Sequence, residues 1–495
     1  MSRSLAIAAG AGFSFGGYII GQAVRFMFSL AVARLLGADA LGTYALAMAV
    51  IQIAEVAALA GLDSALLRFS GMHRNDPVRR RRLIGFVLKT GFFLSLAVML
   101  LLELLAGSLA GMLNGGRMLQ LAIACYAAAV PFNAATMLYG HAMQAAGRIE
   151  PKIIATQVLS PLLLLSFTLL LNASSGREAA LLFPFALSAA SAFFWIRPRL
   201  SDLTGMEPGD WRRAPFERSV LSYAMPFLLV SLLSMTAHWL DIVMLGMLTD
   251  PGTVGLYHPA ARTAGLIRAV LPAFAGMAAP MFAELHAAGS TGELERMYQL
   301  VTRWMVTVVV PPVLLFLLFP APVLSVFGAH FTKAAPVLGL LTAGAFLQAL
   351  FGISATLLAM AGHSRLSLLN ALSALTLQVA LNLLLIPRMG IEGAASAGLI
   401  VFGVLALARL VEVRLLLGLH PFSRPLLKPF VAGSAAGMLL IISRGWLLTL
   451  PFPALLAVAA GAAVAVYMGV LLILGLEEED REIILRAGFL IGRGR

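Results

Sequence analysis

The chain has 495 residues, of which 60% are hydrophobic and 12% charged, and its mean hydropathy is +0.93. A soluble domain carries about 25% charged residues, so this composition excludes an ordinary soluble protein and indicates a polytopic membrane protein. The net charge of +12 is explained by Lys and Arg in cytoplasmic loops, and no nucleic-acid partner is expected. The single cysteine, Cys125, excludes an internal disulfide and a cysteine-based metal cluster.

Fourteen apolar runs predict membrane-spanning helices, because a bilayer core of about 30 Å needs about 20 apolar residues per helix. The first run continues past Arg25 and is followed at once by others, so we interpret it as a retained helix rather than a cleaved signal peptide. The runs cover residues 13–33, 41–62, 83–107, 118–140, 153–172, 177–196, 220–247, 253–278, 299–319, 333–360, 366–386, 391–416, 425–446 and 451–474. Prolines at 131, 259, 272, 311 and 312 predict bends within these helices.

The distribution of Lys and Arg predicts the orientation. With the N-terminus in the cytoplasm, the inner segments hold 26 of the 35 basic residues, the outer turns hold 6, and Arg25, Arg262 and Arg268 lie within spans. Both termini are therefore expected in the cytoplasm, in agreement with an even number of spans.

An internal repeat divides the chain into two halves of six spans and two extra helices. The turn 33–44, ARLLGADALGTY, has a second copy in LGMLTDPGTVGLY at 245–257. Six spans place both copies in the same orientation, so the repeats are parallel and a substrate path between the halves is expected. The predicted parts are an N-lobe (1–196), a cytoplasmic linker (197–219), a C-lobe (220–418), two further helices (419–476) and a cytoplasmic tail (477–495).

Four motifs resemble the oligosaccharide-lipid (O-antigen, Wzx-type) flippases, which share the fold of the MATE transporters in the MOP superfamily. The motifs are ARLLGADALGTYAL with GLDSALLRF at 33–69, LDIVMLGMLTDPGTVGLYHPAAR at 240–262, LSVFGAHFTKAAPVLGLL at 324–341 and LNLLLIPRMGIEGAASAG at 381–398. The resemblance covers nearly the whole chain and implies an all-α, 14-helix MATE-like membrane protein. It also implies a bacterial inner-membrane flippase that moves an undecaprenyl-pyrophosphate-linked oligosaccharide to the outer leaflet for surface polysaccharide or lipopolysaccharide synthesis.

Ionisable residues inside spans are candidates for function, because each costs about 2.5–3.5 kcal/mol at a helix centre. They are Arg25, Glu55, Asp241, Arg262 and Arg268, with Glu103 near a helix end. Arg25 lies about 18 Å and Arg268 about 15 Å from the inner ends of their spans. Arginine binds phosphate through two parallel hydrogen bonds, so Arg25, Arg268 and Arg262 are the predicted substrate-binding residues.

Structural roles remain open for the same side chains. Glu55 could pair with Arg25, and Asp241 with Arg262, or these two carboxylates could couple transport to a cation. His141 and His238 are interpreted as helix-packing residues. The run Arg79–Arg82 is interpreted as an orientation signal and lipid anchor, and Glu477–Asp480 as a solvated tail. Gly10, Gly12, Gly16 and Gly17 are expected to let the first helix pack closely against a neighbour.

The sequence carries no enzyme signature, no helical metal pair and no nucleotide-binding loop, so neither catalysis nor a cofactor is expected. The predicted function is flipping by alternating access. A cation-coupled drug or lipid exporter of the same fold is the first alternative, and a membrane-embedded glycosyltransferase or ligase is the second. The expected partners are a lipid-linked oligosaccharide, membrane lipids and other polysaccharide-assembly proteins.

Overall fold

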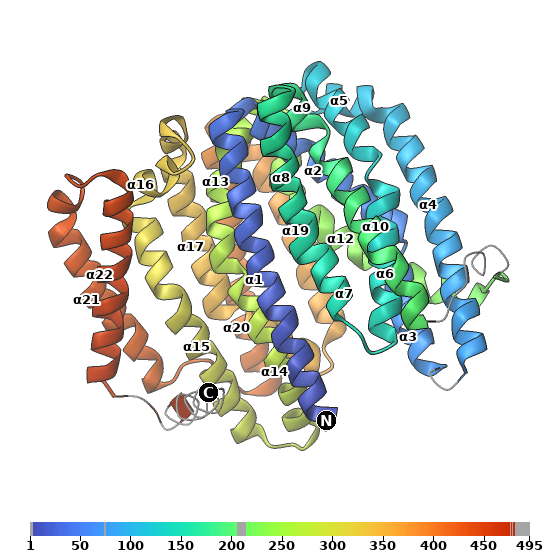
Figure 1. Ribbon diagram of the computed structural model, residues 1–495. Coiled ribbons are helices and arrows are strands. Elements are labelled where there is room, and N and C mark those ends of the chain that lie inside the picture. The colour runs from blue at the N-terminus through green and yellow to red at the C-terminus, as the bar shows by residue number, and fades with distance from the viewer. Residues whose placement is uncertain (1–2, 74–75, 205–213, 476, 478, 481–495) are drawn as a thin grey trace, which may run out of the picture. The chain divides into compact units, whose positions relative to one another are not determined.

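The computed structural model describes residues 3–73, 76–204, 214–475, 477, 479 and 480, and every regular element in these ranges is a helix (Figure 1). The all-α class is therefore confirmed. In the N-terminal part the elements are α1 (Arg3–Leu35), α2 (Ala38–Leu59), α3 (Leu62–Met72), α4 (Pro77–Met112), α5 (Gly116–Ala127), α6 (Val130–Ala145), α7 (Glu150–Ile153), the π-helix η1 (Ile154–Leu159), α8 (Ser160–Ser174), α9 (Arg177–Leu182), α10 (Pro184–Thr204), α12 (Arg218–Leu248) and α13 (Pro251–Arg268).

The C-terminal part continues with α14 (Val270–Ala287), α15 (Thr291–Leu318), α16 (Pro320–Ser325), the 3-10 helix η2 (Ala329–Ala334), α17 (Ala335–Phe351), α18 (Ile353–Met360), α19 (Ser364–Met389), α20 (Ile391–Leu417), the 3-10 turn η3 (Arg424–Leu426), α21 (Leu427–Leu447) and α22 (Phe452–Ile473).

Thirteen of the described helical segments are long and apolar enough to cross a membrane. The predicted sixth span, residues 177–196, is not among them. It forms the short helix α9 and the 21-residue helix α10, and α10 carries Arg197 and Arg199 in its C-terminal half. These charges lower the hydropathy of α10, so the count of fourteen spans stays a prediction while the polytopic membrane class is confirmed.

Prolines account for several helix breaks. Pro131 cannot donate a backbone hydrogen bond to Ala127, where α5 ends, and α6 begins beside it at Val130. Pro226 causes no such break, since α12 begins at Arg218 and continues through Pro226.

The helices group into two compact units, residues 1–259 and 260–495. In the first unit α12 packs against α2 and α3, and α2 also contacts α4, α5 and α6. A buried apolar cluster joins α3, α4 and α6 at one end of this unit, with Leu62, Leu66, Leu83 and Leu138 among its members. The predicted division into two lobes and a linker at 197–219 stays a prediction.

The two copies of the repeated turn pack directly against each other within the first unit. A Cβ atom on Gly42 of α2 would overlap the carbonyl oxygen of Pro251, and one on Gly255 of α13 would overlap that of Ala38. Each helix start therefore packs against the glycine of the other. The repeat found in the sequence corresponds to a real helix crossing that only glycine allows at both positions.

In the second unit α17 lies against α15 and α20, and α19 against α20. The hairpin of α21 and α22 packs on α15 through Gly433, where a Cβ would lie 2.7 Å from Val310, and through buried Tyr467.

The acidic tail differs from its prediction. Glu477 forms an ion pair with Lys428 at 2.6 Å, and Asp480 forms one with Arg303 at 2.8 Å. The interpretation as a solvated end is therefore wrong for Glu477 and Asp480, because partners distant in sequence neutralise both, and Glu478 lies outside the described residues.

Candidate functional site

Helix α1 crosses α7 and the π-helix η1 closely through two glycines one turn apart, Gly17 beside α7 and Gly21 beside η1. A Cβ on Gly17 would overlap the side chain of Ile153, and one on Gly21 would overlap the carbonyl oxygen of Gln157. Small residues at this spacing let membrane helices approach one another. The expected packing role is confirmed for Gly17. It is wrong for Gly16, where a Cβ would meet open space, and Gly21 takes its place.

This crossing holds the half-buried Arg25. Its guanidinium donates from Nη1 and Nη2 to Gln157 Oε1, both at 3.1 Å, and from Nη2 to the carbonyl oxygen of Thr156 at 3.3 Å. In a π-helix the carbonyl of residue 156 would accept from residue 161, which is Pro161 and has no N–H. The carbonyl of Thr156 is thus available to Arg25. Pro161 in the fifth predicted span therefore accounts for this contact of the Arg25 guanidinium.

Glu55 and Asp241, the carboxylates predicted inside spans, each accept a hydrogen bond from a neutral side chain. Asn133 of α6 donates to Glu55 Oε1 at 2.6 Å, and Tyr257 of α13 donates to Asp241 Oδ2 at 3.2 Å. One turn before Glu55, Gln52 accepts from the indole of Trp239 on α12 at 3.2 Å. Helix α2 therefore carries two polar side chains that bond to neighbouring helices. The pairings of Glu55 with Arg25 and of Asp241 with Arg262 stay predictions.

Arg262 and Arg268 belong to the second unit and are both half-buried on α13. Arg268 is the last residue of that helix and donates to the carbonyl oxygen of Ala261 at 3.3 Å. Pro272 cannot donate to the carbonyl of Arg268, so the helix breaks at Ala269 before α14 begins. The break places the guanidinium and the backbone carbonyl of Arg268 at the junction of α13 and α14. The role of Arg262 and Arg268 in substrate binding stays a prediction.

The two histidines differ. His141 is buried, with Nδ1 2.7 Å from the carbonyl oxygen of Met137 and Nε2 2.9 Å from Lys152 Nζ, which also donates to Gln144 at 2.9 Å. The packing role expected for His141 is thus supported by its bonds. His238 is exposed and lies edge-on to the neighbouring Trp239 ring, and its helix-packing role stays a prediction.

The basic run on α4 also does more than expected. Arg79 forms a two-point ion pair with Glu217, at 2.8 and 3.0 Å, and Glu217 is buried just before α12. This residue ties α4 to the start of α12, whereas Arg81 and Arg82 are exposed as a lipid anchor would be.

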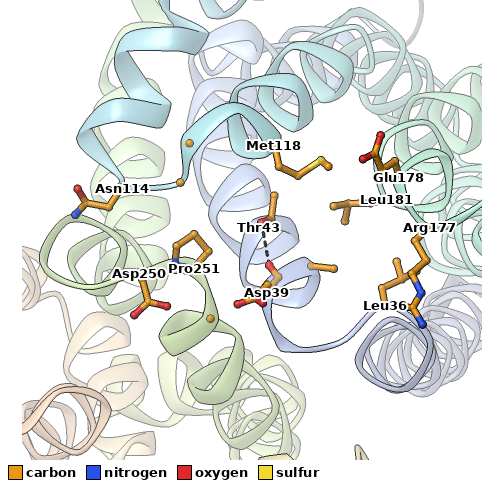
Figure 2. Close-up of a pocket in the computed structure, with 14 residues that line it drawn as sticks. Leu36, Asp39, Thr43, Asn114, Met118, Arg177, Glu178, Leu181, Asp250 and Pro251 are labelled. Carbon is orange, nitrogen blue, oxygen red and sulfur yellow. Dashed lines mark hydrogen bonds between the residues drawn. The ribbon is translucent and has the colours of Figure 1, made fainter.

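Sequence reasoning missed a cavity of about 490 Å³ in the first unit (Figure 2). Four helices begin around it: α2, α5, α9 and α13. Figure 2 shows Asp39 and Asp250 on one side and Arg177 with Glu178 on the other. Asn114 bonds through its amide to the carbonyls of Gly246 and Met247. The polar groups around the cavity are mainly hydrogen-bond acceptors. Such a lining suits the hydroxyl groups of a ligand better than an anionic group.

Asp250 caps helix α13. Its carboxylate accepts from the Thr253 hydroxyl at 2.6 Å and from the Thr253 backbone N–H at 3.0 Å. The hydroxyl bond, together with backbone N–H groups, lowers the pKa of Asp250 below its usual value. The Asp-Pro pair at 250–251 is a helix-start signal, so the cap was readable from the sequence, whereas the cavity depends on the packing of four separate segments.

Within the ranges that the structure describes, no group of three or more His, Cys, Asp or Glu side chains could hold a metal ion. The arrangement offers a half-buried arginine on a close helix crossing, carboxylates bonded to neutral partners and an acceptor-lined cavity. These groups can bind and release a polar ligand within a bundle of spanning helices.

Comparisons with known proteins agree with this description. A model of the family described as polysaccharide biosynthesis protein matches residues 7–286. A relative from Haloferax volcanii, named probable low-salt glycan biosynthesis flippase Agl15, is 24% identical over 392 residues, which are 78% of this chain and 79% of that protein.

Solved structures show the fold. The lipid II flippase MurJ in an inward closed conformation matches with a TM-score of 0.75 at 12% identity, over 96% of this chain and 100% of that one. An inward-facing multidrug MATE transporter of the MOP superfamily matches with a TM-score of 0.68 at 16% identity, over 82% and 98%. The predicted MATE-like fold is confirmed. The matched proteins are flippases and transporters, in agreement with the expectation that this chain is not an enzyme.

Proposed function

The chain belongs to the polysaccharide biosynthesis protein family, and from this premise we propose that it is a flippase for a lipid-linked glycan. The family match over more than half of the chain carries the proposal. The relative from Haloferax volcanii, itself named a glycan biosynthesis flippase, supports it. In detail, the proposed substrate is an undecaprenyl-pyrophosphate-linked oligosaccharide for surface polysaccharide or lipopolysaccharide synthesis. It would cross the bacterial inner membrane by alternating access, with both termini of the flippase in the cytoplasm.

Arg25 is the residue on which the proposed binding site depends. Two of its nitrogens are already fixed by Gln157 and the Thr156 carbonyl, so the guanidinium plane is oriented before a ligand arrives. The Nη1–Nη2 edge that now donates to Gln157 Oε1 could instead donate two parallel bonds to a pyrophosphate that displaces Gln157. Arg268 and Arg262 are the proposed further contacts, and lipids and other polysaccharide-assembly proteins are the proposed partners.

The test is flipping in vesicles. Purified protein is reconstituted with a fluorescent lipid-linked sugar, and the fraction in the outer leaflet is measured with time by an impermeant quencher. We expect transport that requires the protein and a pyrophosphate-linked substrate, and no hydrolysis of ATP or of the lipid-linked sugar. Turnover of either compound would replace the flippase proposal with an enzyme or a pump.

A cation-coupled exporter is the second candidate, and the Glu55–Asn133 contact favours it. A carboxylate bonded to a neutral amide inside a span could take up and release a proton or a metal cation. Under this candidate Glu55→Gln would abolish transport while Arg25→Ala would not. The flippase proposal expects the arginine to matter more.

A further inference from the structure

Three described residues that follow α22, namely Gly475, Glu477 and Asp480, contact α15 and α21 of the second unit. Lys428 Nζ lies 2.6 Å from Glu477 Oε1 and donates to the carbonyl oxygen of Gly475 at 2.7 Å. Asp480 Oδ1 accepts from Arg303 Nη2 and from the indole nitrogen of Trp304, both at 2.8 Å. Two carboxylates of one short segment thus meet two cations that lie 125 residues apart in the sequence.

The cationic side of this contact is built into the fold, and the acidic side is more exposed. The side chain of Arg303 is 6% exposed and that of Asp480 21%. A buried guanidinium without an anion would leave an uncompensated charge, which is strongly destabilising. The position of Arg303 therefore requires an anion at all times, although it does not require this particular one.

The site lies at the boundary of the apolar surface. Lys428 is in the first turn of α21, and Gly475 follows the last turn of α22, so the open end of this hairpin carries the site. Around it, Leu427, Phe430, Leu472 and Ile473 are exposed apolar side chains. Exposed apolar residues beside a Lys, an Arg and a Trp are typical of the level at which lipid headgroups lie.

We propose that Arg303, Trp304 and Lys428 form a binding site for the phosphate of an anionic phospholipid, and that Glu477 and Asp480 occupy it as an intramolecular competitor. A phosphate diester offers charged oxygens to the same three donors, while its acyl chains lie against the apolar residues of α21 and α22. The carboxylates mimic the phosphate, so lipid and tail exclude each other. This site is separate from the proposed flipping activity and does not depend on it.

The experiment measures lipid bound to the full-length protein. Detergent-purified protein is titrated with phosphatidylglycerol, and bound lipid is counted by native mass spectrometry, with phosphatidylcholine as the neutral comparison. The double variant Glu477→Gln with Asp480→Asn removes the competing charges and keeps the side-chain shapes. If the tail occupies the site most of the time, we expect phosphatidylglycerol affinity to rise about tenfold and phosphatidylcholine binding to stay unchanged.

Two further variants make the result specific. Glu479→Gln removes one charge from the same segment, and the described ion pairs of the tail involve Glu477 and Asp480 instead, so its affinity should equal that of the wild type. Adding Lys428→Gln to the double variant should remove the gain. If the double variant folds poorly, Glu477→Gln alone, which frees only Lys428, should give a smaller gain of the same sign.

Each remaining outcome overturns the proposal. Equal phosphatidylglycerol affinity in the wild type and the tail variants would make the contact a structural staple only. An equal gain in Glu479→Gln would reduce it to general charge attraction. Competition by inorganic phosphate at the concentration at which the lipid binds would make it a site for a free ion rather than for a headgroup.

Discussion

Arg25 is a charged residue within a predicted span, and Gln157 and Thr156 fix its orientation. Its role in binding can be tested separately from the packing of α1. If it binds pyrophosphate by two parallel bonds, Arg25→Lys should lose transport nearly as fully as Arg25→Ala, because an ammonium lacks the planar fork. Protein level should stay normal for both. The measurement is surface glycan together with the amount of protein in the membrane. Arg34→Ala is the matched control, since Arg34 is exposed at the other end of the same helix and should leave display unchanged.

The competing structural role of Arg25 predicts another pattern. If Arg25 neutralises Glu55, Arg25→Ala should lower the protein level, and Arg25→Ala with Glu55→Ala should restore it. Normal display from Arg25→Ala and Arg268→Ala at normal protein level would end the claim that these arginines hold the substrate.

The carboxylate of Asp250 makes a separate prediction about pH. Its folded-state pKa is depressed by the Thr253 bonds, so its contribution to stability is present above the usual Asp pKa of about 4 and is lost as the pH falls through the lower folded value. Asp250→Asn keeps a capping side chain without the charge, whereas Asp250→Ala should cost about 1 kcal/mol at neutral pH. Thermal unfolding in detergent at pH 7 and pH 3 checks this. Asn should lose less stability than the wild type on acidification, and an equal loss would contradict the prediction.

At the scale of helices, the crossing of α1 and η1 depends on a backbone contact. Gly21→Ala would place a Cβ against the carbonyl oxygen of Gln157 and 3.1 Å from Arg25 Nη1. A backbone atom cannot move aside as a side chain does, so we expect a loss of about 1–3 kcal/mol and a lower midpoint of thermal unfolding. Gly16→Ala on the same helix is the control, because nothing lies within 4 Å of its Cβ position. Equal midpoints for the two variants would show that the crossing is loose.

The sequence predicted helices well and their contacts poorly. Spanning helices depend on the local length of an apolar run. Pro131 and Pro272 marked helix breaks that the structure contains, after Ala127 and after Arg268. The partners of Arg25 could not be predicted from local sequence, because Gln157 lies 132 residues away. The carbonyl of Thr156 is available to Arg25 because Pro161 has no N–H to donate to it. The prediction for the acidic tail failed for the same reason. Four acidic residues in a row are typical of a solvated segment, and only the packing of α22 on α15 brings Asp480 to Arg303.

For the whole molecule the first prediction concerns orientation. In a Cys125→Ala background, cysteines at Arg117, Arg177 and Arg388 should react with an impermeant thiol reagent from outside the cell. Cysteines at Arg82 and Arg148 should not. All five positions are exposed, so their reactivity reports the side of the membrane rather than burial. The reverse pattern would overturn the orientation and the parallel-repeat interpretation that depends on it.

The last prediction concerns the energy for transport. An anionic pyrophosphate that moves outward carries negative charge from the negative to the positive side of the membrane, so the potential favours it by about 2.3 kcal/mol per charge per 100 mV. No ion needs to be coupled unless charges of the protein cross in the opposite direction. We therefore expect flipping in vesicles to slow several-fold when an ionophore dissipates the potential, and to be unchanged when potassium replaces sodium at constant potential. A strict sodium requirement would instead favour the cation-coupled exporter, and Glu55→Gln should then remove both transport and its sodium dependence.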